Sequence, residues 1–595
     1  GDAGTGKSRL LQEFKGAMRT EGAQWVEGRA YAYTQSTPYY PLIDMLNRLW
    51  GIEESDPAET LRTKLKNGVQ DLMGPREDIL PYLGSLYGGV YPEIEGTSPE
   101  VWHERLYEAT YEIMLALARQ APTVFCVEDL HWADSGTLSL LQKLADHFRA
   151  STILVCTYRP PFNLFSLHQL RTLGSLRHDL PLRELSASET REMLASLLDG
   201  DQLPPKLHEM VHERAGGNPF FLEEVINSLL DAGTLARRDE GWRLAENFQI
   251  TDIPASVHGV INARLDRLER RSKRILQEAS VIGRAFLFAI LERITSFEAE
   301  LERRFNDLER IDLVHARTIV PELEFAFKHA LTQEVSYKSL LRSERADIHE
   351  RIAGVMEVIF EDRIAEFYET LAYHYQRGRS TFKAVHYLIR SGVKSLRRCA
   401  LVDSQAYFED AFTLLKEMES DDPQVQRALV EVLIHWSFVF YYLGDFKTLL
   451  ALLENHLELA ESEGAKPLRG RFLAVMGCAL WHRARFRQAE TYLLEARQWG
   501  HDNEDFLAVG YACAWLAWVQ SELGKFEAAM AHAREGMALY EEGRVKAHYI
   551  YFSSLGGSAW THLHCGNRAK TETDGRRLLQ FGRKHSNVRS MVMGH

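Results

Sequence analysis

The chain opens with Gly1-Asp2-Ala3-Gly4-Thr5-Gly6-Lys7-Ser8, which fits the P-loop pattern G-x-x-x-x-G-K-[ST] and leads directly into a helical pattern that starts at Arg9. The glycines let the backbone curl until successive N–H groups point at phosphate oxygens. Lys7 supplies charge for the β- and γ-phosphates, Ser8 a hydroxyl for Mg²⁺, and the helix the positive end of its dipole. The competing interpretation is a glycine-rich turn before a surface helix. We predict a nucleotide site formed by Gly1 to Ser8 together with Arg9.

A P-loop normally follows a buried β-strand that ends at its first glycine. In this sequence that glycine is residue 1, and no initiator Met is present. We therefore expect a fragment whose first strand, together with any effector domain, lies upstream of the sequence.

Composition limits the class of protein. The length of 595 residues exceeds what one core holds and predicts about three to five domains. The net charge of −13 argues against a general nucleic-acid or anionic-membrane surface. The six cysteines form no C-x-x-C pair, and no apolar run reaches about 18 residues. We therefore predict a cytoplasmic protein with reduced cysteines, no membrane segment and no direct nucleic-acid binding.

A continuous apolar strand is predicted over Thr123–Val127, and Glu128 and Asp129 follow it directly. Such a strand is typical of a parallel sheet covered on both faces, where ligands bind at the carboxyl ends of the strands. One carboxylate can hold Mg²⁺ through water while its neighbour polarises the attacking water. A simple acidic turn is the alternative interpretation. Asp134 is predicted to cap a helix.

A second buried strand, Thr152–Thr157, ends two residues before Arg159. An arginine at this strand tip can contact the γ-phosphate and so distinguish ATP from ADP, although strand-end arginines also form surface ion pairs. Helical patterns follow at 185–198 and 207–230. Between the main helices, Pro219 stands at a helix start, where stereochemistry alone explains it.

These motifs occur in one order along the chain: the P-loop, Val127–Asp134, Thr157–Arg159 and Gly217–Pro219. Together they resemble the STAND class of signal-transduction ATPases, relatives of the AAA+ proteins. More narrowly, they resemble bacterial ATPase-plus-TPR regulators that are often fused to nucleotide cyclase, protein kinase or LuxR-type DNA-binding domains. The resemblance covers essentially the whole chain.

The resemblance implies a role for each motif. Glu128 would be the Mg²⁺-side acid of the Walker B pair, and Asp129 the catalytic-side acid. Arg159 would be the sensor arginine, and Pro219 would contact the nucleoside. AAA+ enzymes typically carry Asp then Glu at this pair, whereas this chain has Glu then Asp. Because the shorter Asp129 reaches less far toward water, we expect slow turnover.

A new unit is expected from residue 251. Its expected elements are helices near 257–267, 271–281 and 299–310 and strands near 313–319 and 324–327. This is a winged-helix pattern, and its mixed charges without a basic recognition helix argue against DNA binding. In the class that the chain resembles, the module packs on the nucleotide domain, and a histidine at the wing end contacts the β-phosphate of ADP. His329 stands at that place, although by residue type alone it would be a buried or capping histidine.

From about residue 361 the sequence becomes repetitive. Turns that separate pairs of apolar-periodic helices recur at spacings of 40, 40 and 42 residues, counted between Phe446, Phe486, Phe526 and Arg568. The pattern predicts a TPR-like array, truncated at its C-terminal end, whose concave side binds partners.

The predicted fold is an α/β P-loop NTPase domain with a parallel sheet and its first strand missing, followed by a helical lid, a winged-helix domain and an all-α TPR-like solenoid. The predicted boundaries are 1–180 for the NTPase core, 181–250 for the lid, 251–360 for the winged helix and connector, and 361–595 for the solenoid.

The predicted function is a signal-transduction switch that binds ATP or ADP with Mg²⁺ and hydrolyses ATP slowly. A protein or small-molecule inducer on the TPR array would bias its nucleotide state, which would gate an effector and self-assembly. One alternative is the regulatory part of a larger adenylate or guanylate cyclase or serine/threonine kinase. Others are a ring-forming AAA+ motor and a nucleotide-binding scaffold without turnover. The sequence shows no cyclase or kinase motif and no pore loop.

Overall fold

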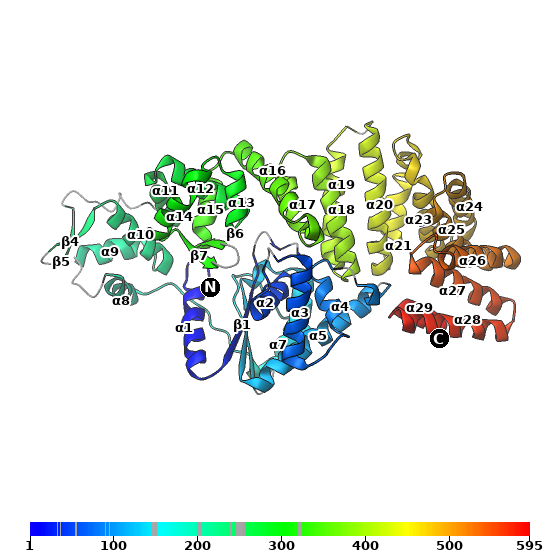
Figure 1. Ribbon diagram of the computed structural model, residues 1–595, viewed down its shortest axis with the longest axis horizontal. Helices are drawn as coiled ribbons and strands as arrows, with labels where there is room; N and C mark the ends of the chain where they lie inside the picture. Colours follow the sequence, from blue (N-terminus) through cyan, green and yellow to red (C-terminus); the bar gives the residue numbers. More distant parts are fainter. Residues whose placement is uncertain are drawn as a thin grey trace.

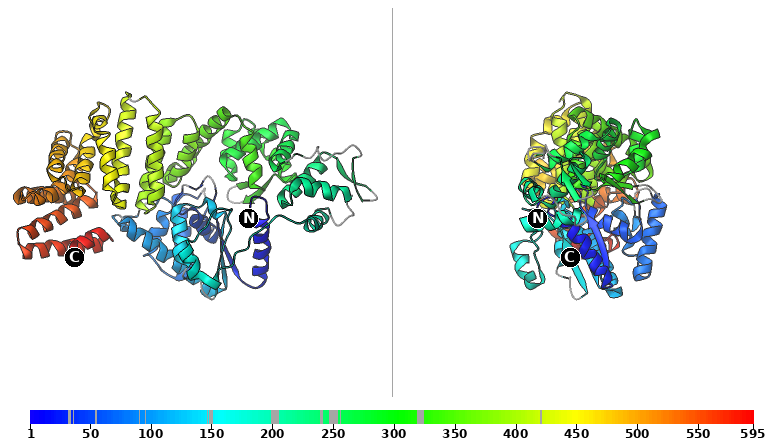
Figure 2. Two further views of the ribbon diagram at one scale, coloured as in Figure 1. Left: turned by 180° about the vertical axis from the view of Figure 1, so that it is seen from behind. Right: turned by 90° about the vertical axis from the view of Figure 1, so that its left-hand side faces the viewer.

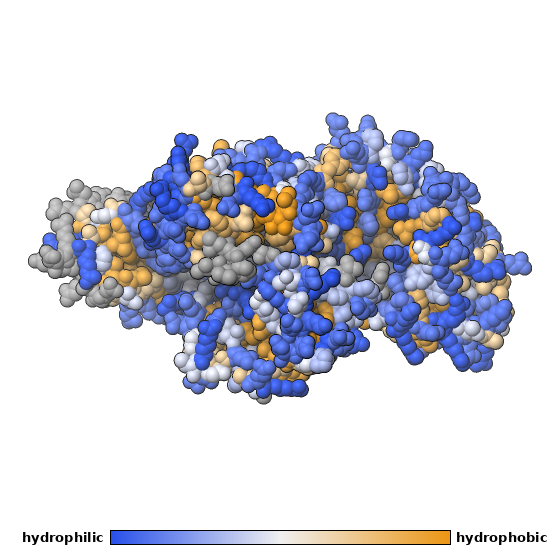
Figure 3. All heavy atoms as spheres, in the orientation of Figure 1, coloured by the Kyte–Doolittle hydropathy of each residue, from blue (hydrophilic) through white to orange (hydrophobic). Residues whose placement is uncertain are grey.

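The computed structural model describes the chain apart from residues 32–33, 36, 54–55, 90, 95, 146, 148–150, 199–204, 239–240, 246–253, 255, 319–323 and 420. An N-terminal α/β core, coloured blue and cyan, lies beneath a long arch of helices (Figure 1). The surface facing the viewer in this orientation is mostly hydrophilic, with scattered apolar patches (Figure 3). The predicted α/β core followed by a TPR-like solenoid is confirmed.

The core sheet consists of β1 (Gln24–Arg29), β2 (Thr123–Glu128) and β3 (Thr152–Cys156), all parallel, in the order β1-β2-β3. Every residue of the central strand β2 is buried, as its unbroken apolar sequence predicts. Arg29 is in register with Glu128. The strands therefore place their carboxyl ends at one edge of the sheet, where β2 leads directly into Asp129.

Helices surround this sheet, and the first begins at the P-loop. They are α1 (Lys7–Thr20), α2 (Tyr40–Trp50), α3 (Ala58–Met73), α4 (Leu80–Ser85), α5 (Pro99–Gln120), α6 (Ser135–Ala145) and α7 (Leu167–Leu173). Helices α2 to α6 bury apolar side chains against Val26 of β1 and Phe125 of β2. Asp134 accepts a hydrogen bond from the backbone N–H of Thr137 at 2.8 Å, which confirms its predicted capping role at the start of α6.

The segment predicted as a lid contains α8 (Ala187–Leu197), α9 (Pro205–Ala215) and α10 (Pro219–Asp231), followed by a hairpin of β4 (Leu235–Arg238) and β5 (Gly241–Leu244). The sequence did not predict the hairpin. Its strands have four residues each, too few for a clear alternating pattern. The predicted lid boundary at residue 250 lies outside the described residues.

The third module contains α11 (Val257–Arg267), α12 (Arg270–Ile282), β6 (Ala285–Leu287), α13 (Phe288–Ile294), α14 (Leu301–Arg310), β7 (Val314–Thr318) and β8 (Glu324–Phe327). Its antiparallel sheet has the order β6-β8-β7. The three predicted helices and two predicted strands are present, and β6 and α13 are additional. A buried ion pair joins the module to the lid, because Arg264 of α11 contacts Glu224 of α10 at 2.9 Å.

Helices make up the rest of the chain. They are α15 (Ala330–Lys338), α16 (Arg342–Ile359), α17 (Tyr368–Arg377), α18 (Thr381–Arg397), α19 (Leu401–Lys416), α20 (Pro423–Leu443), α21 (Phe446–Glu454), α22 (Leu457–Glu461), α23 (Arg469–His482), α24 (Phe486–Asp502), α25 (Phe506–Glu522), α26 (Phe526–Glu541), α27 (His548–His564), α28 (Arg568–Lys584) and α29 (Val588–Gly594). In the part of the chain that the structure describes, none is long and apolar enough to cross a lipid bilayer.

The predicted repeat turns lie between consecutive helices. Gly444, Ala484, Gly524 and Gly566 each adopt a positive φ, between 56° and 74°. Glycine adopts this left-handed conformation without strain, whereas Ala484 adopts it at some cost. Each turn reverses the chain into the next antiparallel helix, which explains the regular spacing seen in the sequence.

Among the described residues, the solenoid contacts the core both near its start and at its far end. Near its start, Asp403 of α19 accepts a hydrogen bond from the hydroxyl of Ser135 at 2.7 Å. At its far end, the Asn587 side chain donates to the carbonyl of Gly96 at 3.1 Å, and Arg589 of α29 lies 3.4 Å from Glu100 of α5. Both ribbon views show α29 curving back toward the core (Figures 1 and 2). The array therefore spans the core instead of extending away from it.

A buried histidine pair joins α16 to α17 and predicts an acid-dependent loss of stability. The Nδ1 atoms of His349 and His374 lie 2.8 Å apart, and burial lowers the pKa of both rings. The folded protein keeps them neutral, whereas histidine in the unfolded chain takes up a proton near pH 6.5. The free energy of unfolding therefore does not change with pH through this histidine pair above about pH 7. It falls below about pH 6.5 by up to about 1.4 kcal/mol per pH unit for each ring.

Thermal unfolding between pH 7.5 and 5 measures this slope. The variant His374→Gln is expected to show a smaller decrease of Tm with acidification than the wild type. His168→Gln, which changes an exposed histidine, serves as the control and is expected to keep the wild-type slope. Equal slopes for His374→Gln and the wild type would contradict the assignment.

Candidate functional site

The first eight residues form a curled loop at the start of α1. Gly4 and Gly6 adopt φ values of 81° and 92°, which L side chains rarely adopt. The Lys7 ammonium donates to the carbonyls of Gly1 at 2.7 Å and of Asp2 at 2.6 Å. The lysine thus folds back over its own loop and lies where the P-loop pattern predicts phosphate-binding charge.

The segment predicted as a lid, which contains α8 to α10, contacts this loop directly. The Asn218 side chain donates to the carbonyl of Ala3 at 2.9 Å, and the backbone N–H of Phe220 donates to the carbonyl of Gly4 at 3.2 Å. A Cβ at Gly4 would lie 2.5 Å from Asn218 Oδ1, so a glycine is required at this position. Pro219, predicted to contact the nucleoside, lies between these two contacts at the first position of α10.

The charges of Asp129 and Arg159, two of the predicted site residues, act on Lys7. Burial lowers the pKa of Lys7, and the charge of Arg159 lowers it further, whereas Asp129 and Asp2 raise it. Asp129 adopts a φ of 55°, and its backbone N–H donates to the hydroxyl of Thr157 at 3.0 Å. This contact links the tips of β2 and β3 and fixes the point from which the Asp129 side chain leaves the sheet.

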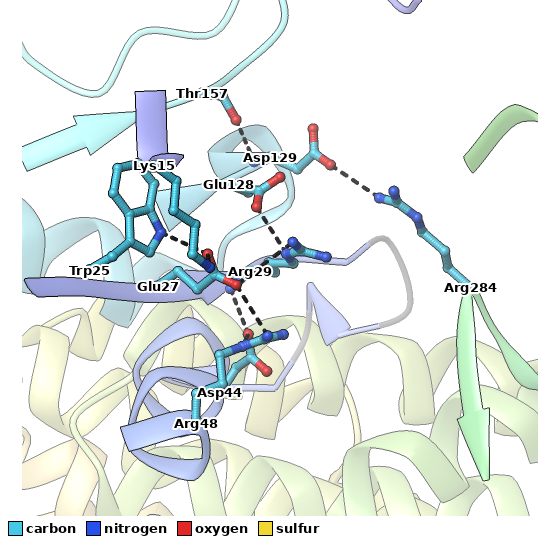
Figure 4. Close-up of polar contacts among 10 residues, drawn as sticks. All are labelled: Lys15, Trp25, Glu27, Arg29, Asp44, Arg48, Glu128, Asp129, Thr157 and Arg284. Atoms are coloured by element: carbon cyan, nitrogen blue, oxygen red, sulfur yellow. Dashed lines mark hydrogen bonds and ion pairs between the residues drawn. The ribbon is translucent and has the colours of Figure 1, made fainter. Parts of the chain in front are cut away.

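Glu128 and Asp129 point in different directions (Figure 4). Glu128 is buried and accepts a hydrogen bond from Arg29 Nε at 3.0 Å, within the hydrogen-bonded polar group formed by Lys15, Trp25, Glu27, Arg29, Asp44 and Arg48. Burial raises the pKa of Glu128, and Arg29 offsets part of this rise. The predicted Mg²⁺-side acid is thus bound to an arginine, whereas the charge of Asp129, like that of Asp2, acts on Lys7.

Two other predicted residues lie on the exposed side of the loop. Ser8, the predicted Mg²⁺ ligand, is exposed in the first turn of α1. Arg9 forms an ion pair with Glu13 at 2.6 Å, one turn along the same helix, and both side chains are largely exposed. Ser8 thus has an exposed side chain at the start of α1, and the Arg9 side chain pairs with Glu13 one turn along the helix.

His329 contacts a residue of the lid segment that in turn binds the loop. Its ring centroid is 4.4 Å from that of Phe220, the residue whose N–H binds Gly4. Burial, with smaller contributions from Lys328 and Arg284, lowers the pKa of His329 to about 4, so the ring is neutral near pH 7. The predicted wing-end histidine and the P-loop are thus joined by one aromatic side chain.

Several buried polar atoms around the loop have no hydrogen-bond partner among the described residues. They are both ring nitrogens of His131, Nε of Arg159 and Nε2 of His329. Such atoms are costly to bury and mark a missing partner. The charges of Lys7, Asp129 and Arg159 act on His131, which places it in the same group. The guanidinium of Arg159 and the single N–H of each neutral imidazole are donors that fit the oxygens of a polyphosphate.

Sequence reasoning missed several residues of this site. Asn218 carried a signal, since Asn before Pro is a common helix start, and His131 lies within the acidic motif itself. Arg29 and Arg284 carried none, because their importance depends on contacts between distant segments.

Within the described residues no cluster of three or more His, Cys, Asp or Glu could hold a metal by itself. A partly open cavity of about 100 Å³ lies elsewhere, and no predicted site residue lines it.

The loop, the parallel sheet and the acidic strand tip define a P-loop nucleotide-binding core, and residues 1–156 match the family described as AAA ATPase domain. This match confirms the predicted AAA-related ATPase domain. Residues 186–240 match a domain of unknown function, DUF8739.

Longer matches extend over most of the chain. An uncharacterized protein of Rhizobium meliloti (strain 1021) is 24% identical over 565 residues, which cover 92% of this chain and 52% of the relative. The chain thus spans about half the length of this curated relative. The structure of a STAND protein with a tetratricopeptide repeat sensor from Pyrococcus horikoshii matches with 12% identity and a TM-score of 0.41, over 98% of this chain and 85% of its own. A Rap protein complexed with Competence and Sporulation Factor matches with 12% identity and a TM-score of 0.32, over 43% and 77%.

Proposed function

We propose that this chain is an ATP-dependent switch that binds ATP or ADP with Mg²⁺ at the P-loop, hydrolyses ATP slowly and passes its nucleotide state to an effector. The observation that carries the proposal is the convergence of unpartnered groups on the loop. Among the described residues, His131, Arg159 and His329 have buried polar atoms without hydrogen-bond partners, and the Lys7 ammonium donates to the loop carbonyls of Gly1 and Asp2.

Each residue would have a separate task. The loop N–H groups and Lys7 would bind the phosphates, and Ser8 and Glu128 would hold Mg²⁺, directly or through water. Mg²⁺, when bound, supplies positive charge to the phosphate oxygens. For this role Glu128 would have to share its carboxylate with Arg29 or bind through water.

The remaining groups surround the reacting end of the nucleotide. Asp129 would orient the attacking water and accept its proton. Arg159 would respond to the γ-phosphate, Pro219 would contact the nucleoside, and His329 would favour the ADP-bound form.

The sensing part would be the solenoid. It contacts the core through Asp403 and through Arg589, so a protein or small molecule that binds the array can change both contacts. ATP-bound chains would then associate, and the effector would respond. We place this switch in the cytoplasm, free of nucleic acid and membrane.

The test is the nucleotide content and turnover of the purified full-length protein. We expect ADP to be released on denaturation, and phosphate to be formed slowly from ATP only when Mg²⁺ is present. Bound nucleotide without any turnover would favour the scaffold alternative. Failure to bind ATP or ADP would refute the proposed function.

The relative of about twice this length supports a larger protein around the switch. In the second candidate function, this chain would be the regulatory part of a larger protein whose output domain is an adenylate or guanylate cyclase or a serine/threonine kinase. That activity would reside outside these residues.

A further inference from the structure

Arg284 is a residue of the third module that extends to the acidic strand tip. It lies between α12 and β6, and its backbone carbonyl accepts a hydrogen bond from the N–H of Phe327 at 2.8 Å. Its guanidinium lies 3.7 Å from Oδ2 of Asp129 (Figure 4). The third module thus contacts the acid to which the proposed function assigns water activation.

The charged surroundings of Arg284 belong to the same site. Its positive charge acts on Glu128 and lowers the pKa of His329 and of His315. The side chains of Arg284 and Asp129 are 24% and 23% exposed, so water screens the pair less than it screens a surface ion pair. Asp129 is held on its other side, because its backbone is bound to Thr157.

We infer that Arg284 is a positioning residue that restrains hydrolysis through Asp129; this inference rests on the proposed function. A carboxylate that orients a water must direct a free oxygen at it. With the third module docked, Oδ2 of Asp129 faces Arg284, whose charge stabilises the carboxylate in that position. When the module moves, Asp129 is released to the water. The same module carries His329, so the movement that frees the acid also removes the histidine from the lid.

Side-chain contacts between helices couple the third module to the solenoid, which is the proposed sensing part. Gln333 of α15 donates to the carbonyl of Ser280 in α12 at 2.6 Å, and Arg274 of α12 lies 3.1 Å from Glu344 of α16. These contacts tie the module that carries Arg284 to α15 and α16, the connector helices that precede the solenoid. A change in the solenoid therefore acts on Asp129 through a short series of packed helices.

The test compares Mg²⁺-dependent ATP turnover and ATP binding in the full-length wild type, Arg284→Gln, Arg284→Lys and Arg303→Gln. Arg284→Gln is expected to raise turnover about three- to fivefold, the range for a partly exposed ion pair. Arg284→Lys keeps the charge and is expected to give an intermediate rate. Arg303→Gln changes an exposed arginine of the same module and controls for the lost charge. In the Asp129→Asn background, Arg284→Gln is expected to have no further effect, which a purely structural role would not predict.

Two results would overturn the inference. The first is unchanged or lower turnover in Arg284→Gln with ATP binding retained, which leaves the proposed function intact. The second is an equal rise in the Asp129→Asn background, because the effect would then not pass through Asp129. A wild type that binds no ATP or ADP refutes the proposed function itself, and the binding measurement separates this case from the other two. If Arg284→Gln does not fold, the Arg284→Lys rate decides, since a value at or below the wild type contradicts the inference.

Discussion

Replacing Lys7 with Ala is expected to weaken the binding of ATP and of ADP by about 100-fold or more, the loss of a charge-assisted contact in a partly dry site. Lys7 is the one lysine among residues 1–8, and its ammonium donates to the carbonyls of Gly1 and Asp2. Phosphate oxygens would replace these carbonyls as its partners. Isothermal titration of the full-length protein with each nucleotide measures the loss.

The control for Lys7→Ala replaces another lysine of the core. Lys66 on α3 is exposed and distant from the loop in sequence, and Lys66→Ala is expected to bind ATP as the wild type does. Circular dichroism should show the same helix content in both variants. Unchanged ATP affinity in Lys7→Ala would refute the assignment of the loop.

The elements that the sequence predicted well are those with a strong local signal. Strand β2 reads as an unbroken apolar run because both of its faces are covered. The P-loop is recognisable because phosphate binding requires glycines at Gly4 and Gly6, and both adopt positive φ. The repeat turns recur because each helix pair needs one left-handed residue between its members.

The elements that the sequence missed depend on contacts over long distances. Strand β6 has only three residues and is recognisable only by its pairing with β8. No local pattern shows that Glu128 binds Arg29, or that Asp129 meets an arginine more than a hundred residues away. Spacing placed both acids at one strand tip, but β2 ends at Glu128 and Asp129 adopts a left-handed φ of 55°, so the two side chains leave the backbone in different directions and have different partners.

Side-chain direction also decides which predicted site residues reach the loop. Arg9 follows the P-loop directly, yet a helix turns each successive side chain by about 100°, and Arg9 meets Glu13 instead. His329 is far from the loop in sequence and contacts the lid through Phe220. Side-chain direction in the fold therefore decides which residues reach the site, and closeness to the P-loop in sequence does not.

The variant Asp129→Asn is expected to lower ATP turnover by about 100-fold while ATP affinity changes little. The amide has the size of the carboxylate but cannot accept a proton from water. The backbone N–H of residue 129 still binds Thr157, so the strand tip keeps its shape. Single-turnover measurement of phosphate release, together with titration of ATP, separates the two effects.

Two further variants show which acid acts on water. Asp71→Asn changes an exposed aspartate of α3 and is expected to keep the wild-type rate. Glu128→Gln removes the charge that pairs with Arg29 and is expected to raise the Mg²⁺ concentration needed for half-maximal turnover, because its proposed partner is the ion. If Glu128→Gln instead abolishes turnover at saturating Mg²⁺ while Asp129→Asn does not, the two acids exchange roles. In that case Arg29, and not Arg284, would be the arginine that holds the water-activating carboxylate.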